Sequence, residues 1–396
     1  MIKRTTLSIL ISVLITTVSV RAQWDSEECP SGSDLNAVCF VNVGLGWTVG
    51  NNGTILNKIN GRWFNYLSPT KENLYSLEML NKDSGWAVGA NGTIIHFNGS
   101  AWEKMESPTD NDLFSVSFKD PDNGVITGEN GTILRYKDKI WNKLDKNIRA
   151  NLYAAQFFDE DIVFGGGMEL LNVPLMKIQS STGNSITSLF DSNIAVTGIV
   201  FTGPDNAWVI GSPSTILHYD GENWIKPELD FKFPSLNHIS FTGENMGICV
   251  GFSGTILIFT GTNWIKEDPV TNEHLNGSVI VNNSYYVVGD NGTILVRHFN
   301  NETGETQQSD QAAGNIGLFP NPCDDLLNVD LTGLPDDPSG IVLIMNLKGE
   351  ILDQKQINIS KGNLHLTIET SGYKSGIYFI KVITGGKVLL SRFIVN

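Results

Sequence analysis

The chain has 396 residues, a net charge of −15, 40 glycines and four cysteines. This acidic balance argues against nucleic acid or an anionic membrane surface as a partner. A low content of charged residues with many glycines is typical of a turn-rich, all-β protein. The length exceeds one usual hydrophobic core, so two domains are expected.

The first 22 residues carry the pattern of a secretory signal peptide. Lys3 and Arg4 form a basic start, residues 7–20 are apolar or hydroxylated, and Val20-Arg21-Ala22 fits a cleavage site. The segment is too short and wrongly flanked for a membrane anchor. No other stretch is apolar for long enough to span a bilayer, so we expect a soluble, exported mature protein.

A phrase of the form Val-Gly-x-x-Gly-Thr-Ile recurs along the chain. It reads VGNNGTIL at residues 49–56, VGANGTII at 88–95, TGENGTIL at 127–134, IGSPSTIL at 210–217, VGFSGTIL at 250–257 and VGDNGTIL at 288–295. The second glycine, or the serine in its place, recurs at steps of 39, 39, 83, 40 and 38 residues. The step of 83 residues corresponds to two repeats, of which one matches the phrase poorly. A period near 40 residues built from short strands predicts a β-propeller.

One repeat unit predicts four strands, at residues 74–79, 85–89, 92–97 and 101–105. Asn91-Gly92 between the second and third strands is a hairpin signal, because a type I′ turn needs two residues with positive φ. The first strand of a unit recurs near Leu35, Leu74, Leu113, Leu152, Val196, Leu236 and Leu275. Seven blades are therefore expected.

The two ends of the repeat region complement each other. Trp24, Pro30 and Leu35 have the same spacing as the fourth strand and its successor in later units, so residues 23–27 predict a fourth strand without partners. The last unit ends near residue 298 without a fourth strand. We expect the first strand to complete the last blade, which closes the ring over residues 23–299 and removes two exposed sheet edges.

All nine tryptophans fall on repeat positions, which predicts packing between blades. No tryptophan is left for a sugar-stacking platform, although tyrosines could serve. Cys29 and Cys39 are expected at different radii of the ring, which does not favour a disulfide between them.

A change of composition follows Arg297. Residues 300–315 are polar and read as a linker. Residues 316–396 contain short alternating strands, which predict a small Ig-like β-sandwich.

Four phrases in this second domain occur in order: FPNP at residues 319–322, NLKGE at 346–350, SGIY at 375–378 and RFIV at 392–395. Through them the domain resembles the C-terminal sorting domain of type IX secretion cargo. The residues that match that family are Pro320, Asn321, Pro322, Gly349, Gly376 and Tyr378. The resemblance implies the type IX machinery as a partner, passage through the periplasm, and delivery to the cell surface or medium, often with removal of the domain.

The repeat W-x-V-G-x-x-G-T-I-L resembles the photosystem II assembly-factor type of propeller over residues 23–298. More weakly, Tyr219-Asp220-Gly221-x-x-Trp224 is similar to Asp-box, sialidase-like repeats. The first resemblance implies a protein-binding scaffold, and no photosynthetic role, since a type IX signal has no such context.

Catalytic motifs are missing from the sequence. A sialidase-type site needs an arginine cluster, but the repeat region has only Arg62, Arg135, Arg149 and Arg297. Arg135 and Arg297 fall on third-strand positions and Arg62 opens a fourth strand, away from the inner strand ends where a shared site would form. Neither a G-x-S-x-G nor an H-E-x-x-H motif occurs. We therefore predict no catalytic, cofactor or metal residues, and a monomeric, non-catalytic module for binding proteins or glycans or for adhesion. The alternatives are a glycan-processing enzyme, either a glycosidase or lyase-like, and a spacer without a specific ligand.

Two exceptions to the repeat are candidate contacts. In the fourth unit residues 165–173 replace the short turn with a longer, apolar loop, which favours Met168, Leu170, Leu171 and Val173 as partner contacts; drift in one blade is the alternative. His238 is the second exception. It takes a position that is small elsewhere, at Ala37, Ser76, Ser115, Ala154, Gly198 and Gly277. We expect it to reach the central channel, with a local packing exception as the alternative.

Overall fold

The computed structural model describes residues 24–298 and 315–395, apart from short gaps at 43, 60, 159–160, 169–170, 179–185, 189–193, 204, 282, 320, 322, 333, 335–336, 347–349, 360–362 and 385–386. The predicted signal peptide, and the predicted linker up to residue 314, lie outside this part. Within the described residues no helix has the length and apolar character needed to cross a membrane.

The first part consists of seven antiparallel sheets of four strands, so the all-β prediction is confirmed. The first three sheets are β2 (Leu35–Asn42), β3 (Leu45–Gly50), β4 (Ile55–Ile59), β5 (Arg62–Asn65); β6 (Leu74–Asn81), β7 (Ser84–Gly89), β8 (Ile94–Phe97), β9 (Trp102–Lys104); and β10 (Leu113–Asp120), β11 (Asn123–Gly128), β12 (Ile133–Lys137), β13 (Ile140–Lys143). The fourth and fifth sheets are β14 (Asn151–Phe158), β15 (Asp161–Met168), β16 (Leu171–Ile178), β17 (Ile186–Ser188); and β18 (Ala195–Gly203), β19 (Asn206–Ser212), β20 (Thr215–Tyr219), β21 (Trp224–Ile225). The last two are β22 (Leu236–Thr242), β23 (Met246–Gly251), β24 (Ile256–Phe259), β25 (Trp264–Lys266); and β26 (Leu275–Val281), β27 (Ser284–Gly289), β28 (Ile294–His298) with β1 (Asp25–Ser26).

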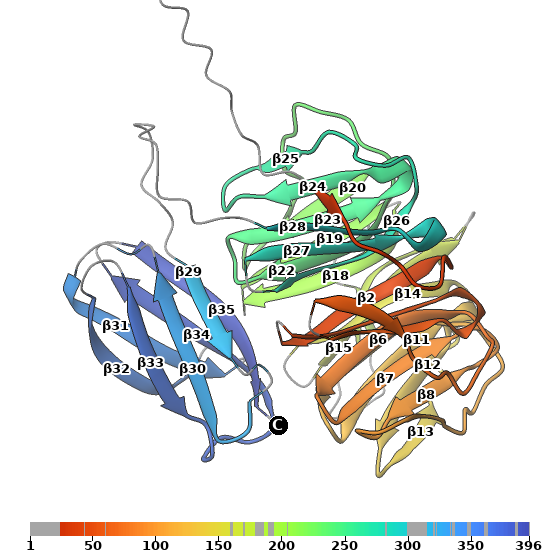
Figure 1. Ribbon diagram of the computed structural model, residues 1–396, viewed down its shortest axis with the longest axis horizontal. Coiled ribbons are helices and arrows are strands. Elements are labelled where there is room, and N and C mark those ends of the chain that lie inside the picture. Colours follow the sequence, from red (N-terminus) through yellow and green to blue (C-terminus); the bar gives the residue numbers. More distant parts are fainter. Residues whose placement is uncertain are drawn as a thin grey trace, which may run out of the picture.

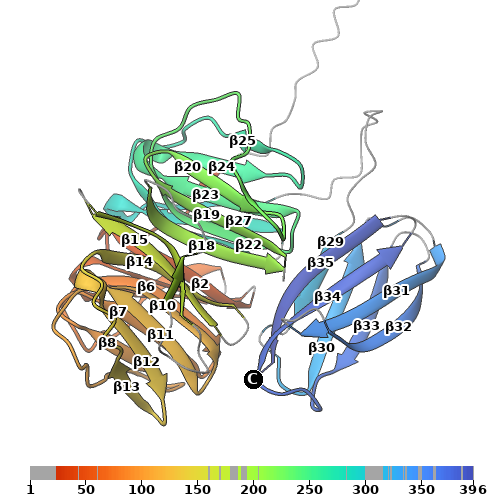
Figure 2. The ribbon, with the colours of Figure 1, turned by 180° about the vertical axis from the view of Figure 1, so that it is seen from behind.

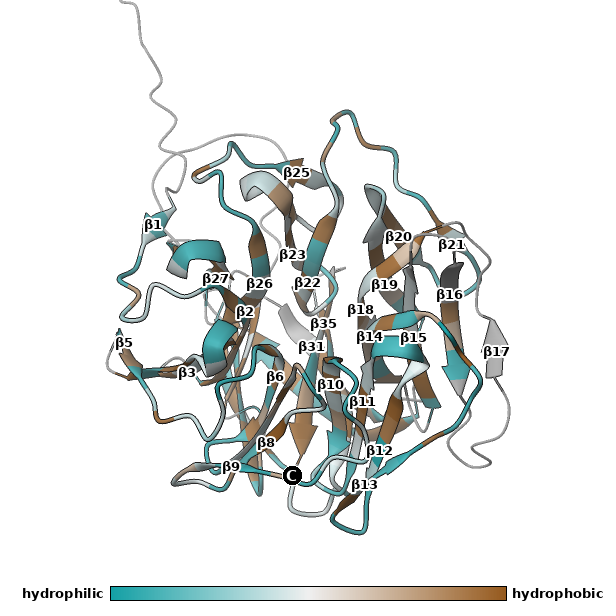
Figure 3. Ribbon diagram, turned by 90° about the vertical axis from the view of Figure 1, so that its right-hand side faces the viewer, coloured by the Kyte–Doolittle hydropathy of each residue, from teal (hydrophilic) through white to brown (hydrophobic). Residues whose placement is uncertain are grey.

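The sheets stand around a common axis, with the first strand of each innermost (Figure 3). Neighbouring first strands contact each other in chain order, and β26 also contacts β2. The strand β1 pairs with β28, with Asp25 opposite Val296.

The same kind of hydrogen bond, from a backbone N–H to a side-chain oxygen, joins several neighbouring sheets. The N–H of Asn52 donates to Asn73 Oδ1 at 2.9 Å, and that of Asn91 donates to Asp112 Oδ1 at 2.9 Å. At the seam between the seventh and first sheets, the N–H of Asn291 donates to Asp34 Oδ1 at 2.8 Å. The seventh and first sheets are therefore joined by the same kind of contact as the other neighbouring sheets.

The two glycines of the repeated phrase allow backbones to approach closely. A Cβ on Gly89 would lie 1.8 Å from the carbonyl oxygen of Asn73, at the start of its own sheet. A Cβ on Gly92 would lie 1.8 Å from the carbonyl oxygen of Thr109, in the segment leading to the next sheet. Gly92 also has a φ of 65°, and Asn91 before it has a φ of 52°, so the predicted turn with two positive φ values is confirmed here.

Tryptophans join neighbouring sheets, as predicted. Each second-strand tryptophan meets the fourth-strand tryptophan of the following sheet almost at right angles. The pairs are Trp47–Trp102 at 5.7 Å and 82°, Trp86–Trp141 at 5.5 Å and 87°, and Trp208–Trp264 at 5.4 Å and 84° between ring centroids. Edge-to-face contacts of buried aromatic rings add to the stability that their burial gives.

Cys29 and Cys39 are both free thiols in the structure. Cys29 packs against the cluster that contains Leu35, whereas Cys39 packs against the cluster that contains Trp47. Burial raises the pKa of Cys39 to about 11, so this thiol is protonated at neutral pH.

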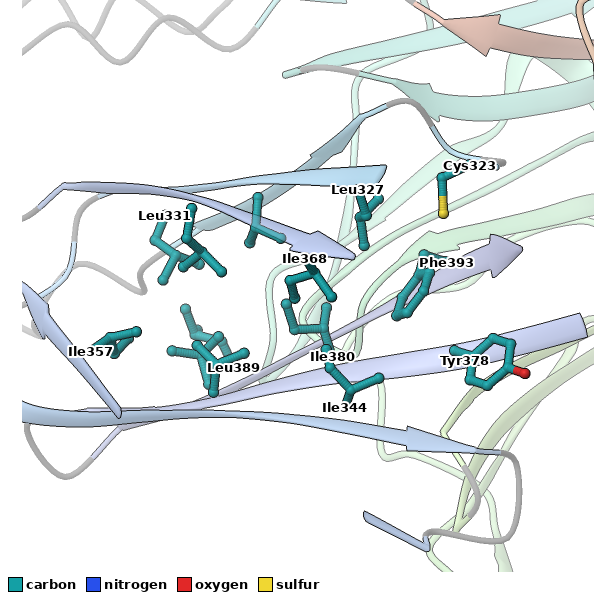
Figure 4. Close-up of a cluster of buried hydrophobic side chains, with 14 of the residues drawn as sticks. Cys323, Leu327, Leu331, Ile344, Ile357, Ile368, Tyr378, Ile380, Leu389 and Phe393 are labelled. Carbon is teal, nitrogen blue, oxygen red and sulfur yellow. The ribbon is translucent and has the colours of Figure 1, made fainter. Parts of the chain in front are cut away.

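The second part is a two-layer sandwich. One sheet holds β29 (Asn315–Phe319), β30 (Leu326–Thr332) and β33 (Leu364–Glu369); the other has the order β32 (Ile351–Ile359), β31 (Asp337–Asn346), β34 (Gly376–Thr384) and β35 (Lys387–Val395). Leu327 and Ile368 of the first sheet face Ile344, Ile380 and Phe393 of the second in a shared core (Figure 4).

The sandwich lies against one face of the ring of sheets (Figures 1 and 2). The strands β34 and β35 contact β10 and β18 respectively. In the view along the axis, β31 and β35 show behind the centre of the ring (Figure 3). One end of the ring is therefore covered and the other is open.

The close approach at Gly89 gives a direct test of the packing. We expect Gly89→Ala to destabilise the chain by more than about 3 kcal/mol, because the new methyl group would overlap a backbone carbonyl that cannot rotate away. Gly44→Ala is the control, since a Cβ there would meet only Asn42 Oδ1 at 3.6 Å. Urea unfolding of both variants measures the difference; equal stability of the two would contradict the proposed constraint.

Candidate binding site in the central channel

A cavity of about 290 Å³ occupies the centre of the ring of sheets. Its walls come from the first strands of the seven sheets, which run along the axis. The lining residues form three successive rows from the open end to the covered end, and the first row has one residue on each of the seven strands.

The row nearest the open end consists of Asn36, Tyr75, Phe114, Tyr153, Thr197, Asn237 and Asn276. Four of them tie neighbouring sheets together. The side chains of Asn36 and Thr197 donate to the carbonyls of Leu74 and Leu236, each at 2.8 Å. Asn237 donates to Leu275 O at 3.0 Å, and Asn276 donates to Leu35 O at 3.2 Å across the seam between the seventh and first sheets. These four polar side chains therefore hold neighbouring sheets together.

The other three side chains of this row form an aromatic arc, made of Tyr75, Phe114 and Tyr153. The ring centroids of Tyr75 and Phe114 are 5.8 Å apart, and those of Phe114 and Tyr153 are 5.2 Å apart. All three are half-buried and line the cavity. The arc thus presents apolar ring surface on one side of the channel, opposite amides and a hydroxyl on the other.

The next row holds His238 among small residues. In this row a side chain accepts an N–H from the next sheet: Ser76 Oγ from Val116 at 3.2 Å, and His238 Nδ1 from Ser278 at 3.2 Å. His238 Nδ1 also lies 3.0 Å from Ser278 Oγ. His238 lines the cavity, which agrees with the expectation that it reaches the channel.

The protonation of His238 follows from this environment. Burial alone lowers the pKa of His238 to about 4, so the ring is neutral at pH 7. Because Nδ1 accepts the N–H of Ser278, the neutral ring carries its proton on Nε2. No charged group contributes to the shift, so neither Glu78 nor Arg392 forms an acid–base pair with it.

The row nearest the covered end carries Glu78. Its Oε2 accepts the N–H of Phe118 at 2.9 Å. Burial raises the pKa of Glu78 to about 7, and the Phe118 N–H and the guanidinium of Arg392 oppose that rise. Arg392 belongs to the sandwich, and with Ile377 and Ile394 it lines this end of the cavity.

The prediction of a long loop in the fourth sheet is wrong in its extent. The strands β15 and β16 continue as far as the pair Met168–Leu171, with Val173 opposite Gly166 and a bulge after Phe164. Pairing satisfies the backbone groups of the inserted residues, and the bulge absorbs the extra length. Leu170 and the side chains of Met168, Leu171 and Val173 lie outside the described part of the chain.

The longer hairpin and the aromatic arc share one face of the ring. Gly167 pairs with Asn151, two residues before Tyr153, so the next pair of this hairpin, Met168 with Leu171, lies beyond the start of β14 at the open end. His238 lies deeper in the channel, on the sixth sheet. The two predicted contact regions are therefore separate, and the aromatic arc lies on the same face as one of them.

The aromatic arc was not predicted. Tyrosines were considered in general as a stacking surface, but no particular tyrosine was singled out, because a large apolar residue in an alternating strand reads as core. The signal that could have revealed it is the comparison of position 75 with its equivalents, where three adjacent units carry rings and four carry Asn or Thr.

The described sorting-motif residues hold the end of the chain in place. Asn321 donates from Nδ2 to Arg392 O at 3.1 Å and accepts the N–H of Ile394 at 2.8 Å. Tyr378 donates to Lys374 O at 2.7 Å and stacks on Phe393 at 5.6 Å. Gly376, with a φ of 155°, begins β34. Pro320, Pro322 and Gly349 lie outside the described residues.

The described arginines of the ring make no shared site. Arg135 donates to Asn123 Oδ1 at 2.9 Å, and Arg297 pairs with Glu267 at 2.7 Å. Neither lines the channel. Among the residues that the structure describes, no three His, Cys, Asp or Glu side chains gather as metal ligands.

Comparison with protein families agrees with the two parts of the chain. Residues 317–396 match the family described as secretion system C-terminal sorting domain, and residues 15–137 match photosynthesis system II assembly factor YCF48. The C-terminal part is thus a sorting domain of type IX secretion cargo, which indicates export to the cell surface or out of the cell. No curated protein matches the chain.

Several solved structures share the fold of the ring. YCF48 bound to D1 peptide has 16% identity and a TM-score of 0.54, over 70% of this chain and 97% of that chain. The WD40 beta propeller domain of Doa1 has 12% identity and a TM-score of 0.57, over 71% and 97%. A catalytically inactive virginiamycin B lyase from Staphylococcus aureus with quinupristin has 13% identity and a TM-score of 0.62, over 70% and 99%. At these identities the likeness shows a propeller fold alone.

The lowered pKa of His238 predicts a pH dependence of stability. As pH falls from 6.5 to 4 the unfolded chain binds a proton at this residue before the folded chain does. The stability that neutral His238 gives above pH 6.5 is therefore lost through this window. At about 1.4 kcal/mol per pKa unit the loss is at most about 3 kcal/mol, and it is smaller because the His238 side chain is only partly buried.

We expect His238→Asn to lose less stability than the wild type between pH 7 and pH 4.5 in urea unfolding. Asn Oδ1 is able to accept the Ser278 N–H in place of Nδ1. His298→Asn, at an exposed histidine outside the channel, is the control. Taking the difference from wild type at each pH removes the contribution of other groups such as Glu78. An unchanged pH slope in His238→Asn would show that the histidine is not desolvated.

Proposed function

We propose that this chain is an exported, non-catalytic binding module that recognises a protein or glycan at the open end of its channel. The module is a seven-bladed propeller over residues 23–299, preceded by a signal peptide at 1–22. A linker at 300–315 and the sorting sandwich at 316–396 follow it. The sorting domain delivers the propeller to the cell surface or the medium, where it acts as a monomer.

Several contacts across the seam between the seventh and first sheets support a closed ring. Besides the pairing of β1 with β28 and the Asn291–Asp34 bond, Lys58 Nζ of the first sheet pairs with the carboxylate of Glu27, which follows β1. Trp63 Nε1 also donates to Glu27 Oε2, at 2.7 Å. The lysine side chain is 4% exposed and lies 4.8 Å from the Tyr286 ring centre.

The aromatic arc is the observation that carries the binding proposal. Half-buried rings at the mouth of a cavity offer flat apolar surface for a ligand. The phenol hydroxyls of Tyr75 and Tyr153 add polar groups at its rim. Peptide side chains and the C–H faces of sugars both suit such a surface. One structure of the same fold, YCF48, is bound to a peptide, which supports a protein ligand.

A glycan-processing or lyase-like enzyme on the same scaffold is the second candidate. His238 in the channel favours it, together with the shared fold of virginiamycin B lyase. We rank it second because a neutral imidazole whose pKa is about 4, and which no carboxylate orients, is a weak general base at neutral pH.

The ring closure predicts a strong effect of Glu27. We expect Glu27→Ala to destabilise the full chain by about 3 kcal/mol or more, because it leaves Lys58 buried without its partner. Asp83→Ala is the matched control, since it breaks the exposed Lys82–Asp83 pair and should cost less than about 1 kcal/mol. Thermal unfolding compares the two; a small effect of Glu27→Ala would argue that the seam carries little of the stability.

Binding is tested with the full chain on printed glycan and peptide arrays. We expect Tyr153→Ala and Tyr75→Ala to lose at least tenfold in signal on the ligands that wild type binds, since each removed ring forfeits about 1–3 kcal/mol of contact. Phe64→Ala removes an exposed aromatic side chain outside the channel and should bind as wild type does. Undiminished binding by the tyrosine variants would place the site elsewhere, and turnover of a glycan that His238→Asn abolishes would support the enzyme.

A further inference from the structure

We propose that the covered end of the propeller is an interaction surface for the chain's own sorting sandwich. In this arrangement the sandwich places Arg392 opposite Glu78 and closes the channel from that side. The surface is distinct from the aromatic arc at the other end. Contact between the sandwich and the covered end can therefore be tested separately from ligand binding at the open end.

Three side chains of the sandwich enter the wall of the cavity. Arg392 and Ile394 come from β35, and Ile377 comes from β34. The ring contributes Glu78 from β6 at the same end. The strands β35 and β34 also contact β18 and β10, so the sandwich meets several inner strands at once. In both side views these two strands face the ring (Figures 1 and 2).

Two glycines at the covered end of the ring allow the sorting sandwich to approach closely. Gly243, between β22 and β23, has a φ of 62°, and a Cβ there would lie 2.3 Å from the carbonyl oxygen of Leu390. A Cβ on Gly203, at the end of β18, would lie 3.2 Å from Leu390 Cδ2. Two adjacent sheets thus leave room for one residue of β35.

The charges across the contact are complementary. The ring supplies the carboxylates Glu78 and Glu244, and the sandwich supplies Arg392 and Lys381. Each cation opposes the rise in carboxyl pKa that burial causes. In the docked arrangement Glu78 and Arg392 each offset part of the cost of burying the other, because burial disfavours the charged form of both groups and each lies near an opposite charge.

The sorting motif itself positions the inserted side chains. Asn321 bonds through its amide to the backbone of Arg392 and of Ile394, the two β35 residues that line the cavity. Cys323 strengthens this connection, because its N–H donates to Ile394 O at 2.8 Å. A motif that matches export cargo therefore also fixes the segment that closes the channel. When the sandwich leaves, the channel opens at both ends and Glu78 becomes an accessible carboxylate at its far mouth.

Charge reversal in the full chain tests this contact. We expect Arg392→Glu and Glu78→Arg each to undock the sandwich, which shifts the radius of gyration in small-angle X-ray scattering to a larger value. The double variant Arg392→Glu with Glu78→Arg restores opposite charges, and should return the radius toward that of the wild type. Lys355→Glu, on the edge strand β32 at the other side of the same sheet, makes the same change in charge and should stay compact.

A steric variant covers the case in which a reversed charge prevents folding. Gly203→Leu adds a side chain against Leu390 without altering a charge, and should undock the sandwich as Arg392→Glu does. Circular dichroism checks that both parts remain folded. Single variants that fold and remain as compact as Lys355→Glu would overturn the proposal, as would a double variant that stays expanded while Gly203→Leu stays compact.

Discussion

The ring depends on the close approach of backbones at its glycines. At Gly89 and Gly92 the chain passes so near two carbonyl groups that no side chain fits there; equivalents of Gly89 recur in the other sheets, whereas Ser214 takes the place of Gly92 in the fifth. Each approach fixes where one strand lies against the start of its own sheet or against the segment leading to the next. The spacing of neighbouring sheets, and with it the width of the channel, follows from that constraint.

A second consequence concerns which side chains remain available for a ligand. In the channel most polar groups are committed to bonds between sheets: Asn237 to Leu275, Ser76 to Val116, and Glu78 to Phe118. His238 follows the same rule, since its Nδ1 replaces a serine hydroxyl as acceptor. A histidine whose hydrogen bond is structural and whose ring is desolvated does not need a catalytic explanation. In the aromatic arc the hydroxyl of Tyr75 bonds to Asn73 and Asp112, and that of Tyr153 accepts from Asn151 Nδ2 at 3.4 Å, so the apolar ring surfaces are the part of the wall left to meet a ligand.

Much of this could be predicted from the sequence, because the repeat is local and its chemistry is direct. The positive-φ turns and the packing of tryptophans between sheets follow from residue type and spacing, and the all-β class from composition. The hairpin of the fourth sheet was predicted less well, because pairing depends on the satisfaction of backbone groups and not on apolar content. The arc was missed because Tyr75, Phe114 and Tyr153 meet only when neighbouring sheets are side by side.

The position of the sandwich lies beyond sequence reasoning for a related reason. Nothing in the pattern around Arg392 distinguishes a strand residue exposed to water from one inserted into another domain, and Glu78 reads as an ordinary exposed position on an alternating strand. Arg392 and Glu78 become part of one contact only when the two domains lie against each other. Because the bonds of Asn321 set the backbone of Arg392, residues that match a secretion signal also determine how the exported propeller is closed. In the proposed arrangement one strand, β35, therefore belongs both to the sorting domain and to the wall that closes the channel.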